Sequence, residues 1–186
     1  MRSALIVALI FTLSQAGIAA DSENERNKSI KDLNLLIGSW RYVDQSTENA
    51  GFNYREEGTI ECAYAFNEAY IQCNGTGHYN NKTRTFIEYI NYNQITKNFE
   101  RVGIFENHPA KAIFTLTVSA DGKTIEQFGA PMHQRDGTVT KNWGSIRFSD
   151  ENHYTWQTRV NYSNEAPDHW PVRFISTYER ITSTNQ

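Results

Sequence analysis

Residues 35–43 read "LLIGSWRYV", and this stretch decides the fold because a short apolar helix gives way to the first strand at Gly38. Ser29 can cap a helix over residues 29–38, with Asp32 three residues on, and Gly38 can provide a left-handed end. Apolar residues that share one face of this helix are Ile30, Leu33, Leu36 and Ile37. A helix this short is not stable alone, so we expect it to pack on a sheet.

The chain after Gly38 has the pattern of β-strands separated by turns, and no helix-length periodicity intervenes. The expected strands cover residues 39–46, 57–66, 69–78, 84–92, 99–106, 111–118, 123–129, 139–148, 153–162 and 171–181. Consecutive antiparallel hairpins of this number can close on themselves and so remove exposed edges. The sequence therefore predicts an all-β fold: an up-and-down antiparallel barrel of about ten strands with a short N-terminal capping helix. A β-sandwich is the alternative.

The two cysteines, Cys62 and Cys73, flank a predicted hairpin. If Phe66 pairs with Ala69, the register places the two cysteines directly opposite each other on one face. An exported chain meets an oxidising compartment, which favours a cross-strand disulfide. The alternative is that both cysteines are small, buried free thiols.

The first 20 residues have the layout of a secretory signal peptide: Arg2, an apolar run too short to span a bilayer, and small residues before a polar segment. We expect cleavage near Ala19 or Ala20 and a periplasmic or secreted product. Residues 21–28 are predicted to be a disordered polar tail, and residues 29–182 a single barrel domain.

A formal net charge of −3 without a basic cluster argues against nucleic-acid binding. No later stretch is long and apolar enough for a membrane span.

The two ends of the domain, "LNLLIGSWRY" and "STYERI", resemble the ends of a lipocalin-like, or calycin, barrel. The middle, from "YINYNQITKNFERVGIFEN" to "LTVSADGKTIE", resembles a bacterial family, the domain of unknown function (DUF) 1579 family, whose members look like calycin-type barrels. The resemblance implies that Gly38 opens the first strand and that Arg180 lies against the ring of Trp40. It implies a structural role for these three residues, since an indole fills a large apolar hole and a guanidinium stacks on its face.

An aromatic barrel interior with a few polar groups suits a small apolar or amphipathic ligand. The residues we assign to ligand binding are Tyr64, Tyr92, Arg101, Phe105, Trp143 and Trp156, and other residues expected to face inward are Phe66, Ile90 and Arg147. A buried, unpaired guanidinium would require an anionic partner such as a ligand carboxylate. A fully packed barrel without a cavity is the alternative, because core and pocket residues share one composition.

The sequence indicates no catalytic residues, metal site or cofactor. The five histidines form no metal-binding pair, and the last strand lacks the histidine with which the related nitrobindins bind haem. The adjacent carboxylates Glu56 and Glu57 point to opposite strand faces and are expected to be solvated. We therefore predict a non-catalytic protein that binds a small hydrophobic or amphipathic molecule. Alternatives are an enzyme with His133 or His169 at the barrel mouth, and an interaction or scaffold protein with a packed barrel.

Overall fold

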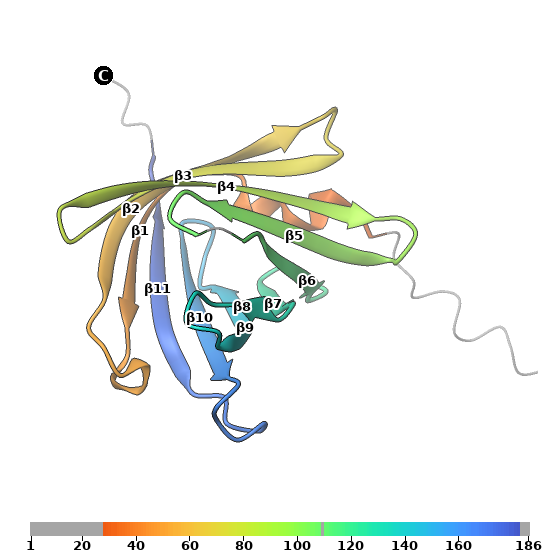
Figure 1. The fold of residues 1–186 in the computed structure, drawn as a ribbon. Helices are drawn as coiled ribbons and strands as arrows, with labels where there is room; N and C mark the ends of the chain where they lie inside the picture. Colours follow the sequence, from red (N-terminus) through yellow and green to blue (C-terminus); the bar gives the residue numbers. More distant parts are fainter. Residues whose placement is uncertain (1–27, 109, 183–186) are drawn as a thin grey trace, which may run out of the picture.

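Ten long strands follow one another along the chain, and each pairs antiparallel with its neighbours (Figure 1). The computed structural model describes residues 28–108 and 110–182. A two-residue strand, β8 (Met132–His133), adds only to β9. The long strands are β1 (Gly38–Ser46), β2 (Arg55–Ala65), β3 (Tyr70–Tyr79), β4 (Lys82–Asn93), β5 (Asn98–Phe105), β6 (Ala112–Val118), β7 (Thr124–Gly129), β9 (Val139–Phe148), β10 (His153–Tyr162) and β11 (Val172–Arg180).

The sheet closes because the last strand pairs with the first. Trp40 lies opposite Arg180, and Tyr42 lies opposite Tyr178, in the β1–β11 ladder. On the other side, β9 pairs with both β7 and β10, so the ten long strands form a complete ring. The predicted closed, ten-stranded, up-and-down barrel is therefore confirmed, and closure leaves no long unpaired edge.

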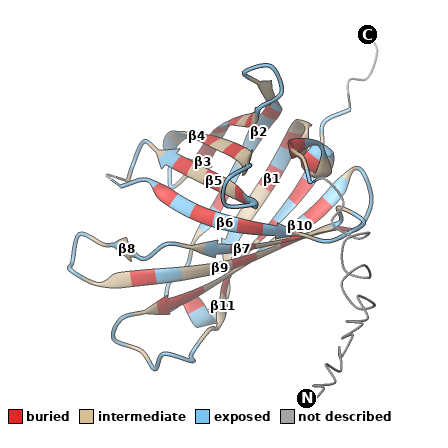
Figure 2. Cartoon of the chain, turned by 90° about the vertical axis from the view of Figure 1, so that its right-hand side faces the viewer, coloured by how far each residue is buried: buried red, intermediate tan, exposed pale blue. Residues whose placement is uncertain are grey.

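Side chains alternate between the barrel interior and the outer surface, which gives the banded burial seen along the strands in Figure 2. The β2–β3 hairpin shows the consequence for its two cysteines. Cys62 pairs directly with Cys73, both are buried, and a disulfide joins them as predicted. The bond therefore belongs to the wall of the interior.

The predicted capping helix is a 3-10 helix, η1 (Ile30–Leu36), and it lies at one end of the barrel (Figure 1). Ser29 and Asp32 form the expected capping box. The helix ends at Leu36 with Ile37 as its cap residue, and Gly38 follows it with the positive φ predicted for this position, +125°. Gly38 is also the first residue of β1, as the family resemblance implies. A Cβ atom at this glycine would collide with the guanidinium of Arg180. The glycine is therefore needed at the place where Arg180 crosses β1.

Trp40 fills the interior beneath η1. Its side chain is fully buried, and its indole nitrogen donates a hydrogen bond to the carbonyl oxygen of Leu36 at 3.0 Å. The Arg180 guanidinium lies over the ring, 4.0 Å from its centroid, which is the arrangement that the family resemblance implies. Arg180 also donates to the carbonyl oxygens of Ile37, at 2.5 Å, and Leu35, at 3.0 Å. These contacts attach η1 to both the first strand, β1, and the last strand, β11.

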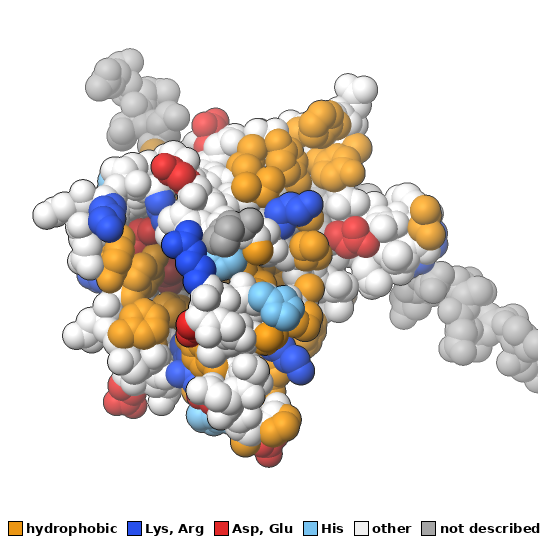
Figure 3. Space-filling model, viewed as in Figure 1, with side chains coloured by type: hydrophobic (Ala, Val, Ile, Leu, Met, Phe, Trp, Pro, Cys, Tyr) orange, Lys and Arg blue, Asp and Glu red, His pale blue; other side chains and the backbone are white. Residues whose placement is uncertain are grey.

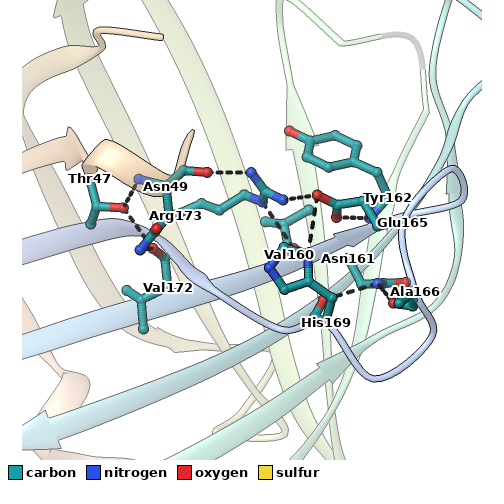
Figure 4. A network of polar contacts seen from close by, with 10 residues as sticks. All are labelled: Thr47, Asn49, Val160, Asn161, Tyr162, Glu165, Ala166, His169, Val172 and Arg173. Carbon is teal, nitrogen blue, oxygen red and sulfur yellow. Dashed lines mark hydrogen bonds and ion pairs between the residues drawn. The ribbon is translucent and has the colours of Figure 1, made fainter. Parts of the chain in front are cut away.

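Arg173 organises the opposite end of the barrel (Figure 4). Its guanidinium donates to the carbonyl oxygens of Val160 and Asn49, the latter in the short 3-10 helix η2 (Glu48–Ala50), and to the carboxylate of Glu165. It also lies 4.7 Å from the ring centroid of Tyr162. One buried cation therefore holds η2 and the β10–β11 loop in place, an arrangement that the sequence analysis did not predict.

The predicted signal peptide, residues 1–20, and all but the last residue of the predicted polar tail lie outside the described residues. In the part of the chain that the structure describes, helices are too short to cross a bilayer.

Candidate functional site

The barrel interior is not completely filled. A cavity of about 180 Å³ lies between η1 and the inner faces of the strands. Most of its wall is apolar, and the aliphatic and sulfur-containing side chains that line it are Leu36, Ile60, Cys62, Cys73, Ile90, Leu116, Ile125 and Ile146. Rings also contribute, from Tyr42, Phe86, Phe105, Tyr154, Trp156 and Tyr178. A cavity of about 150 Å³ holds a molecule the size of benzene, so this space suits a compact ligand.

Three of the six predicted ligand-binding residues, Arg101, Phe105 and Trp156, line this cavity. Two others point inward but lie outside its lining. Tyr64 reaches η1 and donates a hydrogen bond to Asn34 Oδ1 at 3.2 Å, and Tyr92 packs against Phe99 with ring centroids 5.0 Å apart. Both therefore belong to the packed interior at the end that η1 closes.

Trp143 lies on the outer surface, so the prediction that it faces inward was wrong. Its ring stacks on the half-exposed Phe128 at 5.8 Å, and its indole nitrogen donates to Glu126 at 2.8 Å. The strand places its neighbours Gly144 and Ile146 inside instead. The aromatic character of Trp143 suggested burial, but strand alternation decides the face.

Phe66 and Arg147 are exposed as well, against the prediction that they face inward. Phe66 sits at the turn of the β2–β3 hairpin and contacts the rings of Tyr70 and Tyr89. Hydrophobic side chains gather on the outer face over this hairpin in Figure 3. The outer surface of the barrel therefore carries aromatic groups too.

Arg101 crosses the interior and has protein partners for its charge. It forms an ion pair with Glu88, donates a hydrogen bond to Gln127 Oε1 at 2.7 Å, and lies 4.6 Å from the ring centroid of Trp156. Both charged side chains are almost completely buried. Arg101 is therefore not unpaired, and it does not need a ligand carboxylate because Glu88 supplies the anion.

Two buried hydrogen-bond donors in the cavity wall have no acceptor among the described residues: Arg101 Nε and Trp156 Nε1. Gly144 on β9 makes room for the Trp156 indole and for Gln127, since a Cβ there would collide with both. A buried donor without an acceptor costs about 1–3 kcal/mol.

Glu56 is fully buried, so the prediction that it is solvated was wrong, whereas its neighbour Glu57 is exposed as expected. Arg84 donates two hydrogen bonds to Glu56, at 2.5 and 2.7 Å, and the Tyr42 hydroxyl donates a third at 2.7 Å. Burial raises the pKa of Glu56, but the hydrogen bonds from Arg84 and Tyr42 outweigh it and hold that pKa below its ordinary value. This is a second satisfied ion pair inside the barrel.

Asp44 lines the cavity and, among the described residues, forms no ion pair. The Ser176 hydroxyl donates a hydrogen bond to Asp44 Oδ1 at 2.8 Å. Burial raises the pKa of Asp44 to about 6, and the nearby charge of Glu56 adds to the shift while the Ser176 hydrogen bond opposes it. The charge of Arg84, which is paired with Glu56, also opposes the shift. Asp44 is therefore the one carboxylate of the cavity wall without an ion-pair partner of its own among the described residues.

Asp44→Asn is expected to stabilise the protein at pH 7.5 by about 1–3 kcal/mol and to leave its stability at pH 4 nearly unchanged. The pKa of Asp44 is raised to about 6 in the folded state, so ionisation favours unfolding as the pH rises from about 4 to 6. Urea unfolding of both proteins at the two pH values measures the difference. A variant that is less stable than the wild type at pH 7.5 would contradict this reading.

Most of the polar residues of the cavity wall were not predicted from the sequence. Asp44, Arg84 and Glu88 each lie two residues from an inward aromatic or aliphatic side chain on the same strand. Strand alternation alone could have placed them inside. They were overlooked because charged side chains are expected at the surface.

The histidines considered as acid–base groups do not line the cavity. His133 belongs to β8 and is exposed, and His169 lies in the β10–β11 loop with its Nδ1 atom 3.5 Å from Glu165 Oε1. Over residues 28–108 and 110–182, no group of three or more histidine, cysteine, aspartate or glutamate side chains could hold a metal ion.

Comparison with known proteins identifies the fold and the family. A search of curated proteins finds no significant match. The S-type phycobiliprotein lyase CPES from Guillardia theta is similar in structure, with a TM-score of 0.57 and 13% identity over 84% of this chain and 95% of the lyase. Rv2717c from M. tuberculosis has a TM-score of 0.60 and 11% identity over 82% of this chain and 97% of its own. At such identities the likeness shows a shared barrel fold.

The family of the chain is shown by a match in sequence, because structural likeness at such low identity shows only the fold. The model of the family described as "Protein of unknown function (DUF1579)" matches residues 26–174, and the chain belongs to this family.

Proposed function

We propose that this protein is an exported barrel that binds a small amphipathic molecule in its interior without transforming it. The observation that carries the proposal is a largely apolar cavity of about 180 Å³ with a few charged and polar side chains in its wall. Ligand sites in proteins have this composition, with apolar walls and a few polar groups that fix orientation.

The volume limits the size of the ligand. Sites for drug-sized molecules measure roughly 300–1,000 Å³, so a cavity of about 180 Å³ fits a molecule of one ring or a short branched chain. Because Glu88 already balances the charge of Arg101, this guanidinium does not require an anionic ligand.

Export is supported by the sequence of residues 1–20, which has the three-part layout of a signal peptide. The disulfide between Cys62 and Cys73 agrees with it, since such bonds persist in oxidising compartments. We propose a periplasmic or secreted location on these grounds.

Calorimetric titration with 2-phenylethanol, which combines one ring with one hydroxyl group, tests the proposal. We expect saturable, sub-millimolar binding by the wild type and none by Leu116→Trp, in which a larger ring occupies the cavity. Thr117→Trp places the same side chain on the outer face and should bind like the wild type. Equal binding by the two variants, with both shown to be folded by circular dichroism, would place the ligand elsewhere.

A further inference from the structure

The charges inside the barrel do not balance. Three carboxylates, Asp44, Glu56 and Glu88, face two guanidiniums, Arg84 and Arg101. Each guanidinium is paired with one glutamate. The negative charge left over at neutral pH therefore belongs to Asp44.

Asp44 lies among aromatic side chains. Tyr42 precedes it on the inner face of β1, and Tyr178 on β11 stacks on Tyr42 with ring centroids 5.6 Å apart. Tyr154 on β10 stacks on Tyr178 at 4.1 Å, and all three rings line the cavity. Aromatic rings next to a carboxylate form an environment that attracts an organic cation.

Asp44 and Trp156 lie in one row around the barrel. Asp44 pairs with Ser176 across β1 and β11, and Ser176 pairs with Trp156 across β11 and β10. One row around the barrel thus carries a carboxylate, a hydroxyl group and an indole ring. Directly opposed residues on neighbouring strands lie about 5 Å apart, so a molecule whose charged end contacts Asp44 has Ser176 and then Trp156 beside its apolar body.

We propose that the ligand of this cavity is a small organic amine, whose protonated nitrogen pairs with Asp44 while its apolar body contacts the hydrophobic wall. This inference rests on the proposed function, because it names the chemical class of the molecule bound there. An ammonium group would neutralise the unpaired carboxylate. A carboxylic acid ligand would instead bring a second uncompensated negative charge into the interior.

Binding of such an amine should weaken in acid. The groups that face Asp44 are Ser176 and Tyr178 on β11, Glu56 on β2, Arg84 on β4, and Tyr54 just before β2. Glu56 and Arg84 remain paired, because the pKa of Glu56 is lowered and that of Arg84 is raised. Protonation of Asp44 below pH 6 therefore removes the charge that holds the ammonium group.

Three probes of one shape and different charge test the inference by calorimetry at pH 7.5: 2-phenylethylamine, 2-phenylethanol and phenylacetate. We expect the wild type to bind the amine at least tenfold more tightly than the alcohol, and phenylacetate most weakly. Asp44→Asn should remove the advantage of the amine and leave the alcohol unaffected. Glu57→Gln removes one negative charge from the outer face of β2 and should change none of the three affinities.

Two outcomes of these titrations distinguish failure of this inference from failure of the proposed function. If the alcohol binds as tightly as the amine, or phenylacetate binds most tightly, the amine proposal is wrong while ligand binding in the barrel stands. If no probe binds, the proposed function itself fails at this ligand size, and the amine proposal fails with it. Should Asp44→Asn not fold, the wild type at pH 5 replaces it, where a tenfold loss of amine affinity is expected and an unchanged affinity would overturn the proposal.

Discussion

Arg101→Met is expected to lower the free energy of unfolding by about 3–5 kcal/mol. The substitution leaves the carboxylate of Glu88 inside the barrel without a cation, and Gln127 loses its hydrogen-bond donor. Both partners of the ion pair are nearly inaccessible to water, so solvent cannot replace the lost contacts. Urea denaturation at pH 7.5 measures the loss.

A double substitution and a surface control make the result specific. In Arg101→Met with Glu88→Leu, the isolated charge is removed as well, and most of the lost stability should return. Arg147→Met removes an exposed arginine that lies 3.9 Å from Glu126 on the outer surface, and it should cost less than about 1 kcal/mol. A double variant no more stable than Arg101→Met would show that the ion pair itself stabilises the barrel.

Trp40→Ala is expected to cost about 3–5 kcal/mol, the usual range for removing a fully buried ring from a core. The indole packs edge-on against Tyr154 at 4.8 Å, bonds to the Leu36 carbonyl oxygen, and carries the Arg180 guanidinium on its face. Its loss opens a hole beneath η1 and frees the helix from β1. Thermal unfolding followed by circular dichroism measures the effect.

The neighbouring residue provides the control. Arg41 points outward from the same strand, and Arg41→Ala should change stability by less than about 0.5 kcal/mol. If Trp40→Ala were as mild as Arg41→Ala, the barrel would not depend on Trp40 to close this end, and the structural role assigned to it would be wrong.

The barrel could be predicted because its determinants are local or repeat along the chain. Alternating polarity within each strand, such as Tyr154 and Trp156 on one face of β10, is visible in a short window of sequence. The turn at residues 66–69 fixes the register that opposes Cys62 and Cys73. Closure followed from the number of consecutive hairpins and the lack of helices between them.

The polar part of the site could not be predicted in the same way, because its partners are distant in the sequence. Glu56 and Arg84 are 28 residues apart, and Glu88 and Arg101 are 13 apart on neighbouring strands. A single charged residue gives no sign that a counter-charge lies beside it on another strand. Trp143 shows the opposite error, because its large aromatic side chain suggested the interior. Ile146, three residues further along β9, faces inward, so strand alternation places Trp143 on the outer surface.

The interior of this barrel includes features that lower its stability. Asp44 has no ion-pair partner of its own among the described residues, and Arg101 Nε and Trp156 Nε1 lack acceptors there. An apolar core of the same size would avoid these costs. Sites that bind ligands commonly retain such unfavourable groups, because the ligand supplies the missing partners.

Nuclear magnetic resonance of the tryptophan indole N–H groups, recorded during titration with 2-phenylethanol, tests ligand binding inside the barrel most directly. The protein has four tryptophans, and their indole signals report on different places. Trp156 lines the cavity, and Trp40 lies beneath η1 at one end of the barrel. Trp143 lies on the outer face, and Trp170 lies in the β10–β11 loop. We predict that the Trp156 signal moves saturably while the signals of Trp143 and Trp170 stay in place. A Trp156 signal that does not move, or four signals that move together without saturation, would contradict the account.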